Sequence, residues 1–323
     1  MAKKILITGI TGFIGHHFIK SIIQKKYELH ALIRPSTAHS RYKDIQDHVN
    51  LISIDLADTN GLKRFLKNNK FDIIIHIGAI RGGRKFPDRV YYNANVKSTE
   101  QFILSSIENK SKLIFCSSVG IFGAIPNELP ANNYTEKRND NYYHYTKIQS
   151  EALIQKYVLQ GLNAVIVRPS ITYGVNDFGF PFRLTQLIDK KMLLLPDRKF
   201  MIHLTNIDLL QQAFRYLIDT DVPSGSSFIV ADRFPVDFRD LVDFISKELK
   251  GKKYSTNRTI PEKYFRLGEK ISKKLKNSLW TSRFELLSRS WYYDVENSYK
   301  AFGLRSTETI PSFKIVTNWY KNR

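Results

Sequence analysis

The sequence predicts an α/β fold built on a parallel β-sheet with helices on both faces. Short apolar segments alternate with segments of helical spacing through the N-terminal half. The apolar segments are unbroken and rich in β-branched residues, as at Ile5–Ile7 and Ile73–Ile75. Such runs are typical of strands buried on both faces, which occur mainly in parallel sheets.

The alternation places the elements in order. Strands are expected at residues 5–7, 29–33, 51–54, 73–75, 113–116 and 164–167. Helices are expected at residues 17–24, 61–68, 95–108 and 143–160, where apolar residues recur at helical spacing. After Pro169 the pattern becomes irregular and richer in aromatic and basic residues, although residues 228–230 can form one more strand.

These changes predict two domains. Residues 1–174 with about 203–230 are expected to form the sheet domain, and about 175–202 with 231–323 a smaller substrate-binding lobe. A ligand is expected in a cleft between them, at the carboxyl ends of the strands.

Composition fits a folded chain in a reducing compartment. The chain has 323 residues, 42% of them hydrophobic, and a single cysteine, Cys116, which argues against a disulfide-stapled secreted domain. Cys116 lies within an apolar strand segment, so we expect a buried core thiol. No apolar run is long enough for a membrane span and the N-terminus lacks a signal-peptide pattern, which predicts a cytoplasmic location. The histidines show no metal-ligand spacing, and no metal is expected.

The net charge of +20 is unusual. It would suit an anionic partner, but the basic residues are scattered, which favours a solvated lysine-rich surface and no nucleic-acid partner. The densest cluster, residues 247–276, is expected to be exposed helix and loop rather than a recognition motif.

A glycine-rich turn follows the first strand. Gly9 permits a tight turn, Gly12 lets the backbone approach a pyrophosphate, and Gly15 lets the next helix pack close to the strand. The helix N-terminus then offers free N–H groups to phosphates. The sheet domain is therefore predicted to be a doubly wound, Rossmann-type dinucleotide-binding domain, with cofactor contacts from Gly9, Thr11, Gly12, Phe13, Ile14 and Gly15.

The end of the second strand bears on the choice between NAD and NADP. Arg34 takes the place of the acidic residue that binds the ribose of NAD, and an arginine can hold a 2′-phosphate. We therefore expect NADP(H), with NAD(H) as the alternative if Arg34 only stacks on the adenine. Asp55 and Leu56 follow the third strand and are expected to contact the adenine, unless Asp55 only caps a turn.

Tyr143 and Lys147 lie four residues apart at the start of a predicted helix, so they share a face. An adjacent ammonium group stabilises a phenolate, so Lys147 is expected to lower the pKa of Tyr143 and fit it for proton transfer. Ser117 and Ser118 end the fifth strand, and either hydroxyl could hold a reacting carbonyl oxygen.

Together these motifs resemble an extended short-chain dehydrogenase/reductase of the NAD-dependent epimerase/dehydratase type, over nearly the whole chain. The resemblance implies that Ser118, Tyr143 and Lys147 are the catalytic residues. It adds Gly78, Ala79, Asn95 and Pro169 to the expected cofactor contacts, together with Tyr143 and Lys147 themselves. It also implies a homodimer formed through the helices expected at 95–108 and 143–160.

Departures from the family pattern narrow the expected reaction. Val119 and Gly120 replace the Asp-Glu pair of sugar-nucleotide dehydratases, so dehydration is not expected. Ile171 replaces the asparagine of many nucleotide-sugar enzymes. The resemblance favours a ketoreductase that acts on a nucleotide-activated sugar or a similar carbonyl.

Two alternatives stay open. One is a nucleotide-sugar epimerase of the UDP-glucose 4-epimerase kind with tightly held NAD, for which Arg183 and Arg239 are the expected substrate contacts beside Ser118. The other is a binding protein that senses a dinucleotide.

Overall fold

The chain forms two compact units. The computed structural model describes residues 2–82 and 86–323. The first unit comprises Met1–Ile121, Asn141–Arg168 and Leu210–Phe228, and the second comprises Phe122–Asp140, Pro169–Leu209 and Ile229–Arg323. The predicted ranges place 122–140, 169–174 and 203–209 in the sheet domain, but in the structure all three lie in the second unit. For the last two, the reason is that their strands pair with each other in a separate two-stranded sheet.

The first unit is organised around a seven-stranded sheet. Its strands are β1 (Lys3–Thr8), β2 (Tyr27–Ile33), β3 (Asn50–Ser53), β4 (Ile73–His76), β5 (Lys112–Cys116), β6 (Asn163–Pro169) and β11 (Ser227–Val230). They are ordered β11-β6-β5-β4-β1-β2-β3, and the ladders from β3 to β6 are parallel. This order reverses between β1 and β4, which confirms the predicted doubly wound Rossmann-type sheet.

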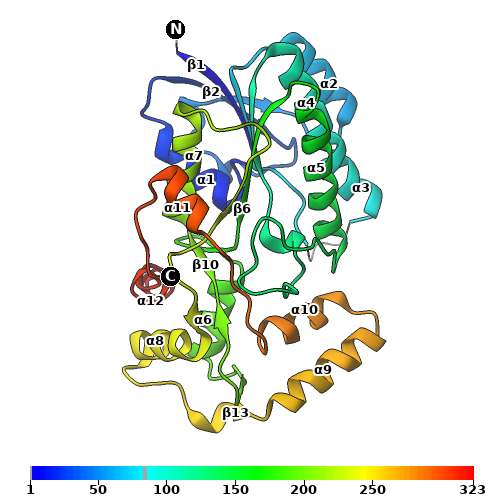
Figure 1. Cartoon of the computed structure of the whole chain (residues 1–323). Coiled ribbons are helices and arrows are strands. Elements are labelled where there is room, and N and C mark those ends of the chain that lie inside the picture. The colour runs from blue at the N-terminus through cyan, green and yellow to red at the C-terminus, as the bar shows by residue number, and fades with distance from the viewer. Residues whose placement is uncertain (1, 83–85) are drawn as a thin grey trace. The chain divides into compact units, whose positions relative to one another are not determined.

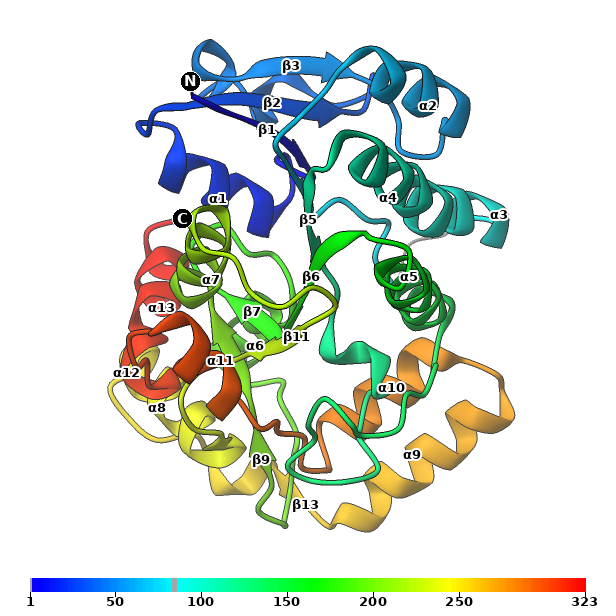
Figure 2. The ribbon, with the colours of Figure 1, turned by 45° about the horizontal axis from the view of Figure 1, so that its top comes forward.

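Helices cover both faces of this sheet, as Figures 1 and 2 show. The helices α2 (Thr59–Asn68), α4 (Ser98–Asn109) and α5 (Tyr142–Val158) lie on one face, and α1 (Phe13–Ile22) and α7 (Ile207–Asp219) on the other. Strand residues that point to the first face, such as Leu6 and Ile166, form one buried cluster with Leu62, Phe102 and Ile154 of the helices. The alternation of side chains along each strand supplies both buried faces at once.

Two helix predictions need correction. The helix expected at 17–24 spans Phe13–Ile22 instead, because its N-cap is Gly12, which has no side chain that would mark the start in the sequence. The helix expected at 95–108 is longer: it begins with α3 (Asp88–Tyr92), passes through a π-helical turn at Asn93–Lys97, and continues as α4. The extra residue of the π turn breaks the helical spacing that the prediction relied on.

The second unit consists of small sheets and helices. Its paired strands are β7 (Ile171–Tyr173) with β10 (Leu204–Asn206), β9 (Met201–Ile202) with β12 (Val236–Asp237), and β8 (Leu195–Pro196) with β13 (Thr259–Ile260). Its helices are α6 (Phe180–Asp189), α8 (Phe238–Lys250), α9 (Glu262–Lys274), α10 (Ser278–Leu286), α11 (Glu296–Phe302), α12 (Thr309–Ser312) and α13 (Lys314–Lys321).

A buried carboxylate ties several of these segments together. The Tyr173 hydroxyl donates to Asp232 Oδ2 at 2.7 Å, and the Thr309 hydroxyl donates to the same oxygen at 2.5 Å. The Asn206 backbone N–H donates to Asp232 Oδ1 at 2.9 Å. Burial raises the pKa of Asp232, and these hydrogen bonds oppose the rise.

Candidate functional site

The turn after β1 leaves no room for side chains at two of its glycines. Gly9 has a φ of +80°, and a Cβ there would lie 2.7 Å from the backbone nitrogen of Gly78. A Cβ on Gly15 would lie 2.3 Å from the carbonyl oxygen of Gly9. Protein packing therefore explains why glycine occupies both positions.

Packing explains Gly12 less fully. A Cβ there would meet a single atom, the Gly9 oxygen, at 3.3 Å. Gly12 is also the N-cap of α1, and within the described residues it gives the first N–H groups of that helix no side-chain cap. A pyrophosphate that approaches this backbone would account for both features. Thr11, Phe13 and Ile14 are half-buried around the same turn.

A neutral histidine, His76, is hydrogen-bonded to the residues that pack against this turn. His76 is buried, which holds its pKa well below the usual value, with a smaller contribution from the charge of Lys147. Thr99 donates its hydroxyl to the Asn95 carbonyl at 2.6 Å, so we assign the proton of His76 to Nε2, which lies 3.1 Å from Thr99 Oγ1. The other ring nitrogen then accepts from Thr8 Oγ1 at 2.7 Å, and that oxygen accepts from the Gly78 N–H at 2.9 Å. This chain of bonds holds Gly78 against the turn.

The ends of β2 and β3 carry the residues expected to contact the adenosine part of a cofactor. Arg34 is exposed, and its carbonyl accepts from the Thr37 N–H at 2.9 Å in a turn. The hydroxyl oxygen of Thr37 is buried and has no hydrogen-bond partner in the part of the chain that the structure describes. Asp55 caps a turn, since its Oδ1 accepts from the Ala57 N–H at 2.9 Å. Leu56 lies close to Gly78, where its Cδ1 would be 2.9 Å from an added Cβ.

The predicted catalytic residues meet at the end of β5 and the start of α5. Asn141 caps α5 by accepting from the His144 N–H at 3.0 Å, which sets Tyr143 in the first helical turn. Ser118 hydrogen-bonds the Tyr143 side chain, and its Oγ accepts from the Gly120 N–H at 3.0 Å. Ser117 is buried, and no partner for its hydroxyl lies among the described residues. Of the two candidate serines, the structure therefore joins Ser118 to Tyr143.

The pKa of Tyr143 shifts in the opposite direction to that expected from its spacing with Lys147. Burial raises this pKa above its usual value and the neighbouring Cys116 adds to the rise, while Arg81 and the hydrogen bond with Ser118 oppose it. Lys147 instead donates to the Cys116 carbonyl at 2.6 Å and lies 4.5 Å from the centre of the Phe115 ring. Its own pKa falls to about 8 because it is buried.

Cys116 is a buried free thiol, as predicted. Burial raises its pKa to about 11, and the charge of Lys147 opposes part of that rise.

Two further interactions hold this cluster in place. Asn95 accepts from the Ile80 N–H at 2.8 Å and donates to the Ile80 carbonyl at 2.9 Å and to Thr146 Oγ1 at 3.0 Å. These bonds make Asn95 a positioning residue between the segment after β4 and α5. Glu151 and Arg168 form a buried two-pronged ion pair, with distances of 2.9 Å and 2.7 Å.

The second unit holds the remaining predicted residues. Pro169 ends β6. Arg183 is exposed on α6. Arg239 is engaged within the unit: it pairs with Asp243 at 3.1 Å and donates to the Tyr254 carbonyl at 2.7 Å. Its guanidinium therefore serves to fasten the segment after α8.

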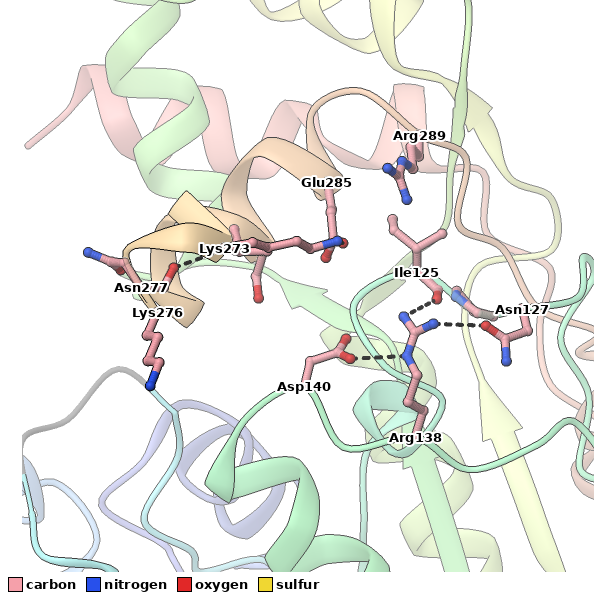
Figure 3. A pocket seen from close by; sticks show the side chains of 12 residues that line it. Ile125, Asn127, Arg138, Asp140, Lys273, Lys276, Asn277, Glu285 and Arg289 are labelled. Atoms are coloured by element: carbon pink, nitrogen blue, oxygen red, sulfur yellow. Dashed lines mark hydrogen bonds and ion pairs between the residues drawn. The ribbon is translucent and has the colours of Figure 1, made fainter. Parts of the chain in front are cut away.

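A pocket in the second unit was not expected from the sequence (Figure 3). It has a volume of about 620 Å³ and lies between the loop after β5 and the helices α9 and α10. Its lining is mostly polar and charged and consists of Ile125, Pro126, Asn127, Arg138, Asp140, Lys273, Lys276, Asn277, Thr281, Ser282, Glu285 and Arg289.

Two of the cations that line this pocket are paired with acidic side chains of the lining. Arg138 pairs with Asp140 at 3.0 Å and donates to the side chain of Asn127 at 2.8 Å. Lys273 pairs with Glu285 at 3.1 Å, and burial raises the pKa of that carboxyl. The lining carries four basic and two acidic side chains and offers many hydrogen-bonding groups, which suits a hydroxylated ligand.

Two features are absent from the described residues. No helix there is both long and apolar enough to cross a lipid bilayer. No group of three or more histidine, cysteine or acidic side chains is arranged to hold a metal ion there.

Comparison with known proteins identifies the family. Residues 5–195 match the model of the NAD dependent epimerase/dehydratase family. The UDP-N-acetyl-alpha-D-glucosaminuronate decarboxylase of Bacillus cytotoxicus is 25% identical over 181 residues, which cover 54% of this chain and 56% of that protein. The dTDP-4-dehydro-6-deoxy-D-allose reductase of a Streptomyces species is 25% identical over 189 residues, covering 54% and 57%. The chain thus spans less than two thirds of the length of either relative.

A solved structure gives the same fold. The UDP-glucuronic acid 4-epimerase from Bacillus cereus in complex with NAD aligns with a TM-score of 0.75 over 99% of both chains, at 19% identity. The order of the sheet, the glycine turn and the match of more than half of the sequence agree with one another. The chain belongs to the NAD-dependent epimerase/dehydratase family of extended short-chain dehydrogenases/reductases.

Proposed function

We propose that this chain is an NADP(H)-dependent ketoreductase that acts on a nucleotide-activated sugar or a similar carbonyl compound. The observation that carries the proposal is the cluster of Ser118, Tyr143 and Lys147 in a unit with the dinucleotide turn. Arg34 at the end of β2 supports the choice of NADP(H).

The cluster suits proton donation to a carbonyl oxygen. NADPH supplies a hydride to the carbonyl carbon when it is bound. Tyr143 donates its proton to the carbonyl oxygen, so the C=O bond becomes C–H and O–H, and the raised pKa keeps this tyrosine protonated at neutral pH. Ser118 donates a hydrogen bond to the same oxygen. Lys147 is a positioning residue, because its bond to the Cys116 carbonyl fastens α5 to the end of β5.

The cofactor proposal rests on the turn after β2. Arg34 is exposed and offers donors to a 2′-phosphate, and Thr37 in the same turn carries a buried hydroxyl that has no partner among the described residues. The pyrophosphate would lie on the N-terminus of α1, against Gly12. The proposed cofactor-binding site also includes Gly78, Ala79, Asp55 and Leu56.

The substrate class rests on the relatives and on the pocket of the second unit. The Streptomyces relative is named as a reductase of a dTDP-linked sugar. The polar lining around Arg138 and Glu285 suits hydroxyl groups. Val119 and Gly120 leave the cluster without the paired acids that dehydration would need.

The cofactor half of the proposal is tested by fluorescence titration of NADPH and NADH. We expect NADPH to bind more tightly, and Arg34→Ala to weaken NADPH binding by about 2 kcal/mol, or roughly 30-fold, with little effect on NADH. Arg64→Ala is the matched control, since Arg64 is an exposed arginine on α2. Equal affinity for the two dinucleotides, or an equal loss in both variants, would contradict the role of Arg34.

The reaction is tested with a panel of nucleotide-linked ketosugars and other ketones. Wild type should consume NADPH in proportion to the alcohol formed, and Tyr143→Phe should lower kcat by roughly 10²–10⁴-fold while cofactor affinity is kept. Product that forms without net consumption of NADPH would favour the epimerase instead. Cofactor binding with no turnover across the panel would favour a dinucleotide sensor.

A further inference from the structure

Helix α9 carries a line of exposed apolar side chains along one face. Tyr264, Leu267, Ile271 and Leu275 are between 51% and 72% exposed. They are spaced three or four residues apart, so they form one stripe along the helix. A contiguous stripe of this kind differs from the single exposed apolar residues that are normal on protein surfaces.

The other face of α9 already has a partner. Phe265 and Ser272 are buried, and the Ser272 hydroxyl lies 2.9 Å from that of Thr281 in α10. A Cβ on Gly268 would lie 2.6 Å from the Phe284 ring, which shows how closely α9 and α10 approach (Figures 1 and 2). Helix α9 therefore packs against α10 through this face. The exposed apolar stripe lies on a different face of α9 and does not take part in that packing.

Cations flank the stripe. At 3.6 residues per turn, Lys263, Lys270 and Lys274 fall within about 40° of one another around the axis, beside Leu267. Both acidic residues of α9 are already paired with other cations: Glu262 with Arg266 at 3.0 Å, and Glu269 with Lys273 at 2.6 Å and Arg289 at 2.5 Å.

Few counter-charges reach these cations. Within the described residues no ion pair involves Lys263, Lys270, Lys274 or Lys276. The flank of the stripe is therefore positively charged and not neutralised.

We propose that α9 docks this protein on the surface of a lipid bilayer that contains anionic phospholipids. A helix with an apolar stripe bordered by lysines is suited to lie in the plane of the interface, with the stripe among the acyl chains and the ammonium groups at the headgroups. The net charge of +20 favours the same partner over long distances. A second copy of the chain fits the stripe less well, because each copy carries the same net charge of +20.

Co-sedimentation with vesicles tests the proposal on the full chain. The probes are vesicles of phosphatidylcholine alone and of phosphatidylcholine with phosphatidylglycerol in equal parts. Wild type should bind the anionic vesicles at least about tenfold more tightly, and binding should weaken as salt is added. Loss of one lysine should cost about fivefold, so Lys270→Glu with Lys274→Glu should cost about 25-fold or more. Leu267→Gln with Ile271→Gln should also weaken binding, with all charges kept.

The matched control is Lys252→Glu with Lys253→Glu. It makes the same change in net charge on exposed residues outside α9 and should retain most of the binding. An equal loss in this control would show adsorption by overall charge and overturn the proposal. So would equal binding of wild type to neutral and anionic vesicles. A change in oligomeric mass for Leu267→Gln with Ile271→Gln, without a change in vesicle binding, would overturn it by marking the stripe as a protein interface. Thermal melts establish that each variant is folded.

Discussion

Replacing Glu151 by glutamine tests how far the buried ion pair stabilises the first unit. Arg168 Nε and Nη2 each donate to one oxygen of Glu151, at 2.9 Å and 2.7 Å. The two side chains are 4% and 0% exposed, so both charges are withdrawn from bulk solvent. Glutamine keeps the shape but leaves the guanidinium without a counter-charge and turns an N–H₂ group toward one of its donors.

The expected cost is large. Removing one partner of a buried ion pair destabilises proteins by about 3–5 kcal/mol. That loss corresponds to a fall in Tm of roughly 10 °C for a unit of this size. Urea unfolding measures it, with Lys97→Met as the control: Lys97 pairs with Glu100 at 2.9 Å on the surface, where such a pair contributes under about 1 kcal/mol.

A double-mutant cycle separates the pair from its surroundings. Glu151→Leu with Arg168→Met replaces both charges by apolar groups, and we expect it to recover most of the stability that either single change loses. A loss of less than about 1 kcal/mol for Glu151→Gln, matching the surface control, would refute the claim that burial makes this pair important.

Three further predictions follow from the same unit. Gly15→Ala should destabilise the chain by roughly 2 kcal/mol and weaken dinucleotide binding, because its Cβ would lie 2.3 Å from the Gly9 oxygen; thermal melts and cofactor titration measure the two effects. Lys147 has a folded pKa of about 8, below the roughly 10.4 of an unfolded lysine, so its buried charge costs stability at neutral pH. That cost is relieved as pH rises from about 8 to about 10.4, and wild type should gain about 3 kcal/mol relative to Lys147→Met over this window; a flat difference in urea unfolding would contradict it. Cys116 has a pKa of about 11 and is buried, so it should resist a thiol reagent at pH 8 in the folded chain and react once urea unfolds it; fast labelling of native protein would count against this.

The sheet could be predicted because its signals are local. Runs such as Ile73–Ile75 are buried on both faces, and burial of that kind leaves a continuous apolar segment in the sequence. Helix boundaries were less predictable where no cap marks them, as at Phe13. The π turn at Asn93–Lys97 interrupts the regular spacing of apolar residues by which a helix is recognised. Helix α3, which precedes this turn, was therefore not predicted.

In the candidate site, too, the positions of residues in short motifs could be predicted, whereas properties that depend on burial could not. Gly9, Gly15, Tyr143 and Lys147 sit in short motifs, and the structure brings each to the expected element. The pKa of Tyr143 could not be read from its spacing with Lys147, because burial depends on the whole fold.

The pocket in the second unit was beyond sequence reasoning. It joins residues near Arg138 to residues near Glu285, which are far apart in the chain. Such a site is created by tertiary contact, and no local pattern records it.

The π turn at Asn93–Lys97 is one residue longer than a regular helix would need between α3 and α4. Shortening this segment by one residue would leave a continuous helix, with both halves still facing their present neighbours. What would be lost is the clasp by which Asn95 holds both polar groups of the Ile80 backbone. A regular helix and the two hydrogen bonds between Asn95 and Ile80 are therefore mutually exclusive here. The extra residue makes the helix less regular, and it allows Asn95 to fix the backbone of the loop at Ile80.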